Sequence, residues 1–416
     1  MDPAYFRGNV GPQDQFLFDV ENSLFMPAGG NARYAPALLD VREIQPTTGS
    51  LAYNSTTVFE IDKIADQLEE ILLECDISAV TNAGSGNTPS IVDGFGYALF
   101  QRIEVAFTSN NIEYIYPEWA IFKHRSYLNM ETQAGWNELV KMNQAPATLT
   151  TLATTGFRLR VPIPTYWQFI RRHSPIIAAL ANRLKFIVQT RPLANLVSNV
   201  TTGTTTIQST AAVVGTSTNG ILRANLINTT GKERDTKTIL TKEPAGVNYL
   251  IDDPQYHFDE VIPEGTTTYT LRLANFDEPI SEIVLLIRGS GYNGTAGDAN
   301  YTQAVQNAVV VPPATIEITS NGLELIRPQT IPYLQNYLFP RVHSAIPSAE
   351  QIVYSFAMAP EMKNAATGSI NFGSLTNPTL NIVWASATPA AYSLTVMAVG
   401  LTWVQQQGGV LLRVFR

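Results

Sequence analysis

The residues best suited to metal binding or nucleophilic catalysis are few and widely separated. The chain has 416 residues but only four histidines and one cysteine. These are His124, His173, His257, His343 and Cys75. Zinc sites usually take their ligands from His and Cys residues a few positions apart, and no such spacing occurs here. The sequence therefore predicts no metal-binding residue and gives no sign of a cofactor. A single cysteine also excludes an intrachain disulfide and fits a reducing compartment.

Two pairs of adjacent acids, Asp252-Asp253 and Asp259-Glu260, could bind a cation or perform acid–base chemistry. Adjacent side chains of a β-strand point to opposite faces, so neither pair would converge on one substrate. We interpret both pairs as solvated turn residues, because exposed acids are common on protein surfaces. Neither a Gly-x-Ser-x-Gly elbow nor a phosphate-cradling Gly-Lys-Ser/Thr loop is present, and we interpret Gly84-Ser85-Gly86 as a turn. The sequence predicts no catalytic residue.

Several aromatic residues could form a platform for a sugar, and five asparagines lie in Asn-x-Ser/Thr sequons. The aromatic candidates are Tyr116, Trp119, Tyr166, Trp167, Trp384 and Trp403. Most lie in or beside predicted strands, where core packing is the usual role. The sequons are at Asn54, Asn199, Asn228, Asn293 and Asn300. They would accept glycans in a secreted protein, but Met1-Asp2-Pro3-Ala4 does not resemble a signal peptide. No apolar stretch is long enough to span a bilayer.

The composition favours a protein that buries part of its surface in an oligomer. Hydrophobic residues make up 45% of the chain and charged residues only 15%, whereas soluble domains have about 25% charged residues. A large core is possible, but little charge is left to cover an isolated monomer. The net charge is -8, and no run of Lys or Arg occurs. Direct nucleic-acid binding is therefore not expected, because it needs clustered positive charge.

Short runs of Thr, Val, Ile, Tyr and Phe, separated by 27 glycines and 25 prolines, indicate many short strands joined by turns. Long helices are not expected, since the prolines are spread along the chain. The length fits two domains. The sequence thus predicts an all-β protein made of two consecutive sandwich domains.

Some strands can be placed from their alternation. Residues 102–107 and 112–116 alternate around Ser109-Asn110-Asn111, which predicts a β-hairpin. Residues 157–161 place Phe157, Leu159 and Val161 on one face and two arginines on the other. A last strand is expected at residues 393–403.

Other segments are less regular. Residues 61–77 fit both a helical face and a strand, and we predict a helical turn at 62–67 that leads into a strand. Short helices are expected at 118–129 and 135–142. Residues 199–219 consist almost wholly of Thr, Ser, Gly, Ala and Val, so they are either a surface loop or a linker between domains.

The second half contains four runs that resemble a known family in order and spacing. They are Leu271-Arg272-Leu273-Ala274-Asn275-Phe276-Asp277-Glu278-Pro279-Ile280-Ser281-Glu282-Ile283, Ile352-Val353-Tyr354-Ser355-Phe356-Ala357-Met358-Ala359-Pro360-Glu361, Thr367-Gly368-Ser369-Ile370-Asn371-Phe372, and Gly408-Gly409. Together they resemble the major capsid proteins of nucleocytoplasmic large DNA viruses, such as iridoviruses and phycodnaviruses. In that family the second run reads close to Y-S-F-A-L-x-P-E and the third close to S-G-T-x-N-F-S.

The first half resembles the same family through scattered matches. They are Gly11-Pro12-Gln13-Asp14-Gln15-Phe16-Leu17, the hairpin followed by Glu118-Trp119, Val161-Pro162-Ile163-Pro164-Thr165-Tyr166-Trp167, and Glu233-Arg234, which resembles the end of the family's first domain. One departure is Pro27-Ala28-Gly29-Gly30-Asn31, which stands where the family has a basic-aromatic segment. The chain is also short for the family.

The resemblance implies two consecutive eight-stranded jelly-roll β-sandwiches with a few short helices in loops. We expect an N-terminal arm at residues 1–25, a first jelly roll at 26–245 and a second at 246–416. The Thr-rich residues 199–219 would then be a loop within the first domain, and the linker would fall near 242–255. Residues 199–219 and 289–300 would form loops on the outward side of a shell.

The resemblance also implies a function as the major capsid protein of an icosahedral double-stranded DNA virus. Homotrimers with a nearly hexagonal outline would tile the outer shell of the virion. We expect them to assemble in the host cell, in the cytoplasm. The expected partners are the chain itself, neighbouring capsomers, and minor capsid and penton proteins. An internal membrane beneath the shell is a further candidate partner, and direct contact with nucleic acid is not expected.

The most basic local cluster could serve such a partner. It consists of Arg158, Arg160, Arg171, Arg172 and His173. These residues could face minor capsid proteins or lipid headgroups at the inner surface. We favour the alternative that they are solvated strand-edge or trimer-contact residues, because surface arginines are common.

Two other classes of function stay open. A β-sandwich carbohydrate- or receptor-binding protein, such as a lectin or a spike, would show exposed aromatic residues in a groove. An esterase or glycosidase with a β-sandwich core would need paired carboxylates or a catalytic triad in one cleft. We do not expect this protein to be an enzyme. A stable trimer in solution would favour the shell protein over the lectin.

Overall fold

The computed structural model describes residues 37–82, 88–167, 174–201, 204–206, 213–229, 246–289, 311–345, 351–361 and 366–414. Several predicted features lie outside these residues. They are the N-terminal arm, Gly84-Ser85-Gly86, Arg171, Arg172, His173, Asn293 and Asn300, together with most of the predicted outward loop at 289–300.

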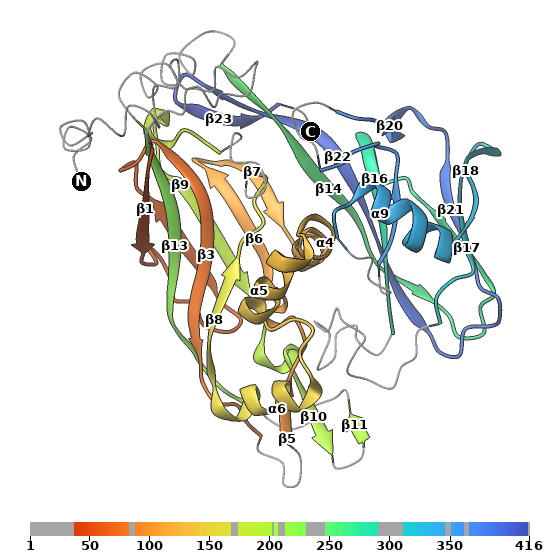
Figure 1. The fold of residues 1–416 in the computed structure, drawn as a ribbon, viewed down its shortest axis with the longest axis horizontal. Coiled ribbons are helices and arrows are strands. Elements are labelled where there is room, and N and C mark those ends of the chain that lie inside the picture. Colours follow the sequence, from red (N-terminus) through yellow and green to blue (C-terminus); the bar gives the residue numbers. More distant parts are fainter. Residues whose placement is uncertain are drawn as a thin grey trace, which may run out of the picture.

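The first half of the chain forms a sandwich of two four-stranded antiparallel sheets (Figure 1). One sheet has the order β1-β13-β3-β8 and the other the order β2-β9-β6-β7. The strands are β1 (Ala37–Ile44), β2 (Thr56–Ile61), β3 (Gln67–Ile77), β6 (Phe100–Phe107), β7 (Asn110–Ile115), β8 (Phe157–Pro162), β9 (Leu184–Thr190) and β13 (Ser217–Thr229). Alternation drives the packing: in β9, Leu184, Phe186 and Val188 are buried and the residues between them are half-buried.

The second half repeats this arrangement with the sheets β14-β22-β16-β19 and β15-β21-β17-β18. The strands are β14 (Val247–Ile262), β15 (Thr268–Arg272), β16 (Pro279–Gly289), β17 (Thr315–Ser320), β18 (Leu323–Thr330), β19 (Gln351–Ser355), β21 (Pro378–Val383) and β22 (Tyr392–Gln407). In each half, one sheet takes the first, eighth, third and sixth of these strands, and the other takes the second, seventh, fourth and fifth. This shared order confirms two consecutive eight-stranded jelly rolls. Short strands β20 (Ile370–Asn371) and β23 (Val410–Arg413) extend the first of these sheets.

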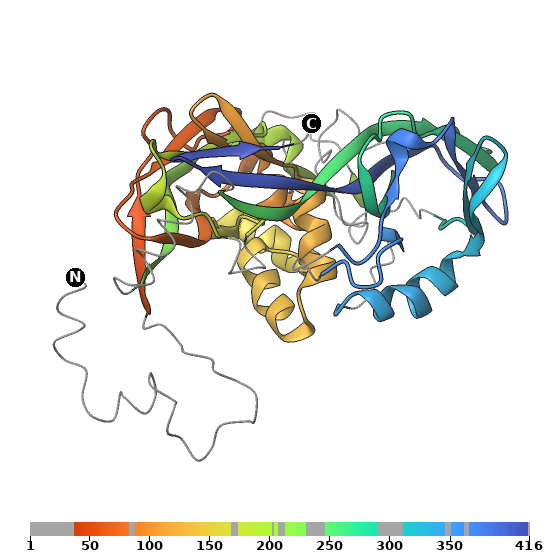
Figure 2. The same cartoon turned by 90° about the horizontal axis from the view of Figure 1, so that it is seen from above.

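The four sheets follow one another across the molecule. Figures 1 and 2 show the β1 sheet at one side, then the β2 sheet, the β14 sheet and the β15 sheet at the opposite side. The β1 and β15 sheets therefore have outer faces without a neighbouring sheet of the same chain. The predicted boundary between the domains at residue 245 stays a prediction.

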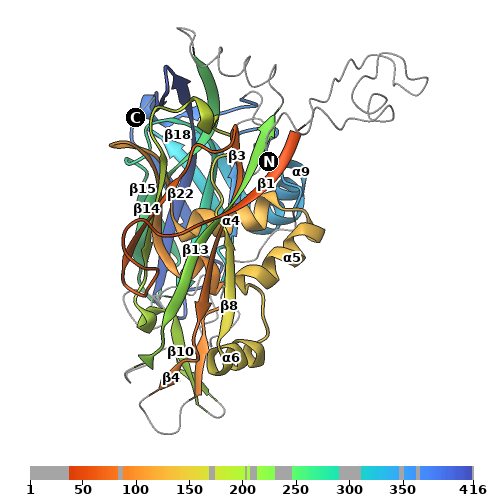
Figure 3. The same ribbon diagram turned by 90° about the vertical axis from the view of Figure 1, so that its left-hand side faces the viewer.

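The long insertions of the first jelly roll gather at one end (Figure 3). They contain β4 (Thr81–Asn82), β5 (Thr88–Ile91), β10 (Val197–Thr201) and α6 (Pro146–Thr155). At the opposite end, β6 and β7 are joined by the short turn Thr108–Ser109. The two ends of the jelly roll thus differ: one carries these insertions, and the other carries the β6–β7 turn and the connection between β8 and β9.

The strand predictions were largely right. β6 and β7 form the predicted hairpin, although its turn lies one residue earlier than expected. β8 has the predicted faces, with Leu159 and Val161 fully buried. The helical turn predicted at residues 62–67 is wrong, because 62–66 hold only bends before β3 begins at Gln67. A register shift in β3 between Leu68 and Glu70 places both Leu68 and Ile71 in the core, and this three-residue spacing resembles that of a helix.

The helix predictions were less complete. α4 (Pro117–Tyr127) closely matches the predicted helix at 118–129. α5 (Met130–Val140) begins five residues before the predicted 135–142, because Asn129 caps it by accepting a hydrogen bond from the Thr132 N–H. Unexpected helices are α3 (Phe95–Ala98), α6 (Pro146–Thr155) and the continuous segment α8 (Ile331–Tyr333), η7 (Leu334–Leu338) and α9 (Phe339–Val342). In the described part of the chain, no helix has the length and apolar character needed to cross a membrane.

Three further boundaries differ from the predictions. The Thr-rich residues 199–219 include parts of β10 and β13, together with β11 (Thr204–Thr206) and β12 (Val213–Val214). Residues 247–255, predicted as part of the linker, belong to β14. The last strand is not 393–403: β22 extends to Gln407, and β23 returns along it after the turn at Gly408 and Gly409.

Candidate functional site

The interface between the two jelly rolls, here called the seam, is formed by α4 and the β14-β22-β16-β19 sheet. Where α4 covers it, this sheet is buried on both faces. Ile283, Leu285 and Ile287 belong to the core of the second jelly roll. The alternating residues Val284 and Leu286 belong instead to the core of the first jelly roll. The two jelly rolls are therefore one packed body, joined through a sheet that has no solvent-facing side here.

A buried ion pair crosses the seam. The Lys123 Nζ of α4 lies 2.6 Å from the Asp252 Oδ2 of β14, and the two side chains are 6% and 4% exposed. The same ammonium lies 4.5 Å from the ring centroid of Trp119 and 3.6 Å from that of Tyr127. Such cation–π contacts add to the attraction when the cation is desolvated. Loss of one partner would leave the other charge buried and unpaired, which is strongly destabilising.

A second polar group joins the jelly rolls beside this pair. His343 Nε2 lies 2.7 Å from Glu282 Oε1, and neither side chain is exposed. Tyr127 OH donates to Glu282 Oε2 at 3.3 Å, and Glu361 Oε1 lies 3.5 Å from His343 Nδ1. Burial alone would lower the pKa of His343, but Glu282 and Glu361 outweigh it and raise that pKa to about 9. The imidazole is therefore charged at neutral pH and neutralises the buried Glu282.

Glu113 of β7 is a buried acid near the same interface. Its Oε2 accepts a hydrogen bond from the Tyr166 N–H at 3.0 Å. Burial raises the pKa of Glu113 to about 8, although that hydrogen bond and the charge of Lys123 act in the opposite direction. This carboxyl group is therefore largely protonated at neutral pH.

The end of β22 holds the second jelly roll against the first. The fully buried Gln406 donates from Nε2 to the Ile176 carbonyl at 2.7 Å and accepts from the Ile176 N–H at 3.1 Å. In the turn that follows β22, the Gly409 carbonyl accepts a hydrogen bond from the Ala181 N–H at 2.7 Å. These bonds satisfy backbone groups of the first jelly roll with atoms of the second, so they fix the angle between the two.

The acid pairs are not the solvated turn residues that we predicted. Asp252 is buried at the seam, and Asp253 forms an ion pair with Arg413 of β23. Asp259 and Glu260 also lie in β14, and Glu260 Oε2 lies 3.0 Å from His257 Nε2. The sequence could not reveal the partners of Asp252 and Asp253, because Lys123 lies in the first jelly roll and Arg413 lies in another strand. The opposite directions of Asp252 and Asp253 agree with strand alternation.

A groove of about 450 Å³ opens beside the seam. Tyr116, Tyr256 and Phe258 line part of it. The rings of Tyr256 and Phe258 stack with centroids 4.7 Å apart, and that of Tyr116 packs at 5.0 Å and 5.3 Å from them. Phe258 is 42% exposed. Of the described part of the molecule, this groove is the best candidate for an aromatic platform.

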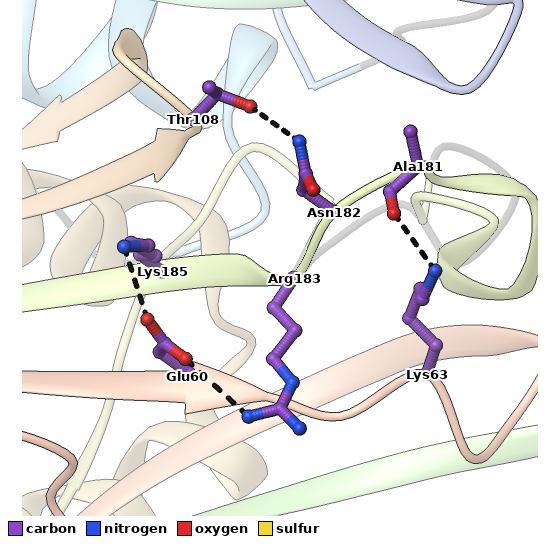
Figure 4. Close-up of a pocket in the computed structure, with 7 residues that line it drawn as sticks. All are labelled: Glu60, Lys63, Thr108, Ala181, Asn182, Arg183 and Lys185. Carbon is purple, nitrogen blue, oxygen red and sulfur yellow. Dashed lines mark hydrogen bonds and ion pairs between the residues drawn. The ribbon is translucent and has the colours of Figure 1, made fainter.

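A second pocket, of about 570 Å³, lies at the end of the first jelly roll that carries the β6–β7 turn (Figure 4). Glu60 lies 3.1 Å from Lys185 Nζ and 3.5 Å from Arg183 Nη1. Lys63 Nζ donates to the carbonyls of Leu180 and Ala181 at 3.1 and 3.0 Å. The basic groups of this pocket thus already bind an acid or backbone carbonyls of the chain, and the pocket is a weak candidate for a charged ligand.

The predicted basic cluster is only partly described, and its described members are paired with acids. Arg158 Nη2 lies 2.8 Å from Glu74 Oε2, and Arg160 Nε lies 3.6 Å from Glu74 Oε1. Arg223 contacts the same carboxylate at 2.7 Å. Burial would raise the pKa of Glu74, but Arg158 and Arg223 hold it below its usual range. Arg158 and Arg160 therefore lie in an ion-pair network on the outer face of the β1 sheet. Acids neutralise this described part of the predicted basic cluster.

The two other candidates, His124 and Cys75, are buried. His124 is buried between Tyr97 OH at 3.1 Å and Asn137 Oδ1 at 2.8 Å, and burial lowers its pKa to about 4. Burial raises the pKa of the Cys75 thiol to about 11, so it is a poor nucleophile. Within the described ranges, no group of three or more His, Cys, Asp or Glu residues is placed to hold a metal ion.

The aromatic and sequon candidates divide by burial. Trp119, Trp167 and Trp384 are buried, as is Tyr166, in agreement with core packing. Trp403 is 42% exposed on β22, and Tyr116 lines the groove. Asn54 is exposed in a turn, while Asn199 and Asn228 lie in strands β10 and β13.

Some seam residues had a signal in the sequence that was not used. Glu282 directly precedes the apolar run 283–287, and Lys123 directly follows the apolar residues 119–122 of a short helix. A charge next to an apolar run is expensive to bury unless it is paired. Their pairing could have been inferred, but the identity of each partner could not.

Comparisons with known proteins agree on the fold. Residues 39–222 match the family model described as "Major capsid protein N-terminus". No curated protein sequence matches the chain. The structure resembles the chain in the PBCV-1 virus capsid model, with a TM-score of 0.70, 15% identity, and coverage of 95% of this chain and 100% of that chain.

Two other solved structures are similar over nearly their whole length. The Faustovirus major capsid protein gives a TM-score of 0.72 at 11% identity, covering 94% of each chain. The Sputnik virophage structure gives 0.65 at 9% identity, covering 94% of this chain and 91% of that chain. At these identities the likeness shows a shared double jelly-roll fold.

Proposed function

We propose that the chain, which has the double jelly-roll fold of the viral major capsid proteins and matches their N-terminal family over residues 39–222, is a major capsid protein of a large double-stranded DNA virus. Its mechanism is assembly, and we expect no catalytic activity. Homotrimeric capsomers would tile the outer shell of an icosahedral virion.

The order of the sheets across the molecule is the observation that carries this proposal. Inside the chain, the β2 sheet and α4 of the first jelly roll meet the β14 sheet of the second (Figures 1 and 2). The same kind of contact can recur between copies, with the β15 side of one chain against the β1 sheet of the next. Contacts of this head-to-tail kind form a ring when the rotation between copies closes. Three copies would give a ring of six jelly rolls, whose nearly hexagonal outline can tile.

The rigid seam supports the same function. A capsomer that must match many identical neighbours needs a fixed angle between its two jelly rolls. Burial of the β14 sheet on both faces, the Lys123–Asp252 pair and the Gln406–Ile176 hydrogen bonds supply that rigidity. Protein–protein contacts that pack like a protein core are typical of permanent assemblies.

The asymmetry of the ends suggests an orientation in the shell. We infer that the end with β10 and α6 faces outward, since loops there can vary without disturbing the core. The end with the β6–β7 turn would face inward, toward minor capsid and penton proteins and an internal membrane. The protein would reside in the virion after assembly in the host cytoplasm, without direct contact with nucleic acid.

We retain residues 1–25 as an arm that reaches beneath neighbouring capsomers, with the jelly rolls divided at 245 and 246. The mass of the purified chain in solution tests the capsomer, and a stable trimer is the expected result. Deletion of residues 1–25 should weaken lattice formation more than trimer formation. A protein that stays monomeric at assembly concentrations would contradict the proposal.

The groove beside the seam favours one alternative, a carbohydrate- or receptor-binding protein. Stacked Tyr256 and Phe258 could contact the apolar face of a sugar, as aromatic rings with one open side do. A glycan array probed with the wild type and with Phe258→Ala would test it. Binding by a monomer that depends on Phe258 would favour this alternative over the shell protein.

A further inference from the structure

Two helices occupy corresponding places in the two jelly rolls. α4 follows the fifth strand of the first jelly roll, β7, after one residue. The segment Ile331–Val342, made of α8, η7 and α9, directly follows the corresponding strand β18. Each begins with a proline in its first turn, Pro117 and Pro332. Both lie along the same side of the molecule (Figure 2).

The first of these helices is covered by the neighbouring jelly roll. Residues 117–126 of α4 are all buried. The ring of Phe122 lies 6.1 Å from that of His343 in the second jelly roll, and Lys123 and Tyr127 reach β14 and β16. Besides β14, the covered surface of the second jelly roll includes the third, sixth and eighth strands of its sheet, through Val284, Val353 and Val399.

The second helix keeps one side open. Ile331, Leu334 and Phe339 are buried against its own jelly roll. Tyr333 and Tyr337 are 43% and 57% exposed, and their rings stack with centroids 5.3 Å apart and planes 26° apart. Residues four apart lie on the same face of a helix. A stacked aromatic pair on an open face is typical of a surface that is covered in an assembly.

The surface that corresponds to the one covered by α4 lies on the β1 sheet. Its third, sixth and eighth strands are β3, β8 and β13. Their outward residues form the ion-pair network of Glu74, Arg158, Arg160 and Arg223, here called the Arg158 face. The side chains of Arg158 and Arg160 are 39% and 48% exposed.

The chemistry of the two surfaces is complementary. Guanidinium groups stack on aromatic rings, and phenol hydroxyls donate to carboxylates. The contact of Lys123 with Tyr127 at the seam is an example within the chain of a cation against a tyrosine ring. Tyrosines at a subunit contact supply both an apolar ring and a polar end.

We propose that the Ile331–Val342 helix docks on the Arg158 face of a second copy of this chain, with Tyr333 and Tyr337 against Arg158 and Arg160. This contact rests on the proposed function, because it is the contact between copies that would close the trimer. It reproduces between chains the position that α4 holds within one chain. The receiving surface is charged, whereas the surface under α4 is mainly apolar. Because a charged surface can face water before it is covered, the contact between chains can form from separately folded subunits.

The double variant Tyr333→Ser with Tyr337→Ser tests the helix side. It should raise the concentration needed for half-maximal trimer formation about tenfold or more, as loss of a central aromatic pair does at protein interfaces. The matched control is Ile64→Ser with Val214→Ser, which removes apolar side chains of 57% and 61% exposure from other surfaces. The control should assemble as the wild type does. Equal thermal stability of both double variants establishes that each is folded.

Cysteine cross-linking tests the pairing directly. The double variant Tyr337→Cys with Arg160→Cys should form covalent dimers and trimers on oxidation, while each single variant should stay monomeric on a denaturing gel. Cys75 is buried and does not interfere. A trimeric double variant that yields no covalent product, or tyrosine variants that trimerise as the wild type does, would overturn this inference and leave the proposed function intact. A monomeric wild type would overturn both.

Discussion

Gln406 of the second jelly roll forms a matched pair of hydrogen bonds with the backbone of Ile176 in the first. Its Nε2 donates to the Ile176 carbonyl at 2.7 Å and its Oε1 accepts from the Ile176 N–H at 3.1 Å. Tyr249 OH also donates to Gln406 Oε1 at 3.4 Å. One side chain thus fulfils the backbone requirements of a residue 230 positions away.

Replacing this residue should weaken the contact between the jelly rolls. Gln406→Ala leaves a buried N–H and a buried carbonyl of Ile176 without partners, and each such group costs about 1–3 kcal/mol. We expect a loss of about 2–4 kcal/mol in the free energy of unfolding, measured by chemical denaturation. The neighbouring Gln405→Ala, at a half-buried position, should change it little. Equal effects of the two changes would contradict the role of Gln406.

The Lys123–Asp252 pair predicts a strong asymmetry between single and double replacements. Lys123→Met leaves Asp252 buried and unpaired, so it should destabilise by about 3–5 kcal/mol. Combining it with Asp252→Leu should recover much of this loss, since an apolar pair tolerates burial. Denaturation of the wild type, both single variants and the double variant gives the coupling. A double variant as unstable as the sum of the single variants would disprove the coupling.

His343 predicts a pH-dependent contribution. A histidine whose pKa is raised on folding stabilises fully below its unfolded pKa of about 6.5, and this contribution is lost as pH rises through the folded value of about 9. His343→Gln should therefore cost most near pH 6. The gap in unfolding free energy to the wild type should shrink by about 2–3 kcal/mol toward pH 10.

Urea denaturation at fixed pH values measures this gap. His257→Gln, in a half-buried contact with Glu260 of the same strand, is the control. A His343→Gln gap that stays constant between pH 6 and pH 10 would mean that the imidazole is not held charged by Glu282.

The raised pKa of Glu113 predicts a pH dependence of the folding stability that a neutral side chain at this position would remove. Burial raises its pKa from 4.5 to about 8, so the folded state keeps a proton that the unfolded state releases. Stability is therefore lost as pH rises from about 4.5 to 8. Glu113→Gln should match the wild type near pH 4.5 and exceed its stability at pH 9 by about 1 kcal/mol or more. The exposed Glu131→Gln should show no such crossover in the same denaturation series.

Gly409 predicts a local packing requirement. Its φ of +83° lies in the left-handed region, and an added Cβ would lie 3.2 Å from the Ala181 nitrogen. Gly265 has a φ of +81° with open space around it. Both Gly→Ala changes should cost about 1–2 kcal/mol for the backbone, and Gly409→Ala should cost more because it also pushes β23 from Ala181. Thermal unfolding of the two variants side by side would show whether this difference exists.

The fold was predictable because alternation and turn residues report directly on strands. The hairpin of β6 and β7 and the faces of β8 follow from local patterns alone. α6 was not predictable, because its sequence is rich in threonine, a weak helix former. In the structure, hydroxyls such as that of Thr151 bond to carbonyls of the preceding turn. The proline at its start and the glycine at its end were the available signals.

The seam was less predictable than the fold. Asp252 has the sequence context of a surface acid, and its partner Lys123 is 129 positions away. Local patterns carry no information about contacts at that separation. Trp403 shows the reverse case: strand periodicity indicated a core residue, but the end of β22 extends beyond its own sandwich and leaves the indole half in solvent.

The double burial of the β14 sheet has a consequence for biosynthesis. Its outward side, with Val284 and Leu286, is apolar and needs α4 as its cover. A chain leaves the ribosome from its N-terminus, and domains generally fold in that order. The helix is therefore already folded when the sheet emerges, so nascent chains avoid a sticky intermediate that would aggregate. A chain permuted to place the second jelly roll first would lack that protection and would depend on chaperones.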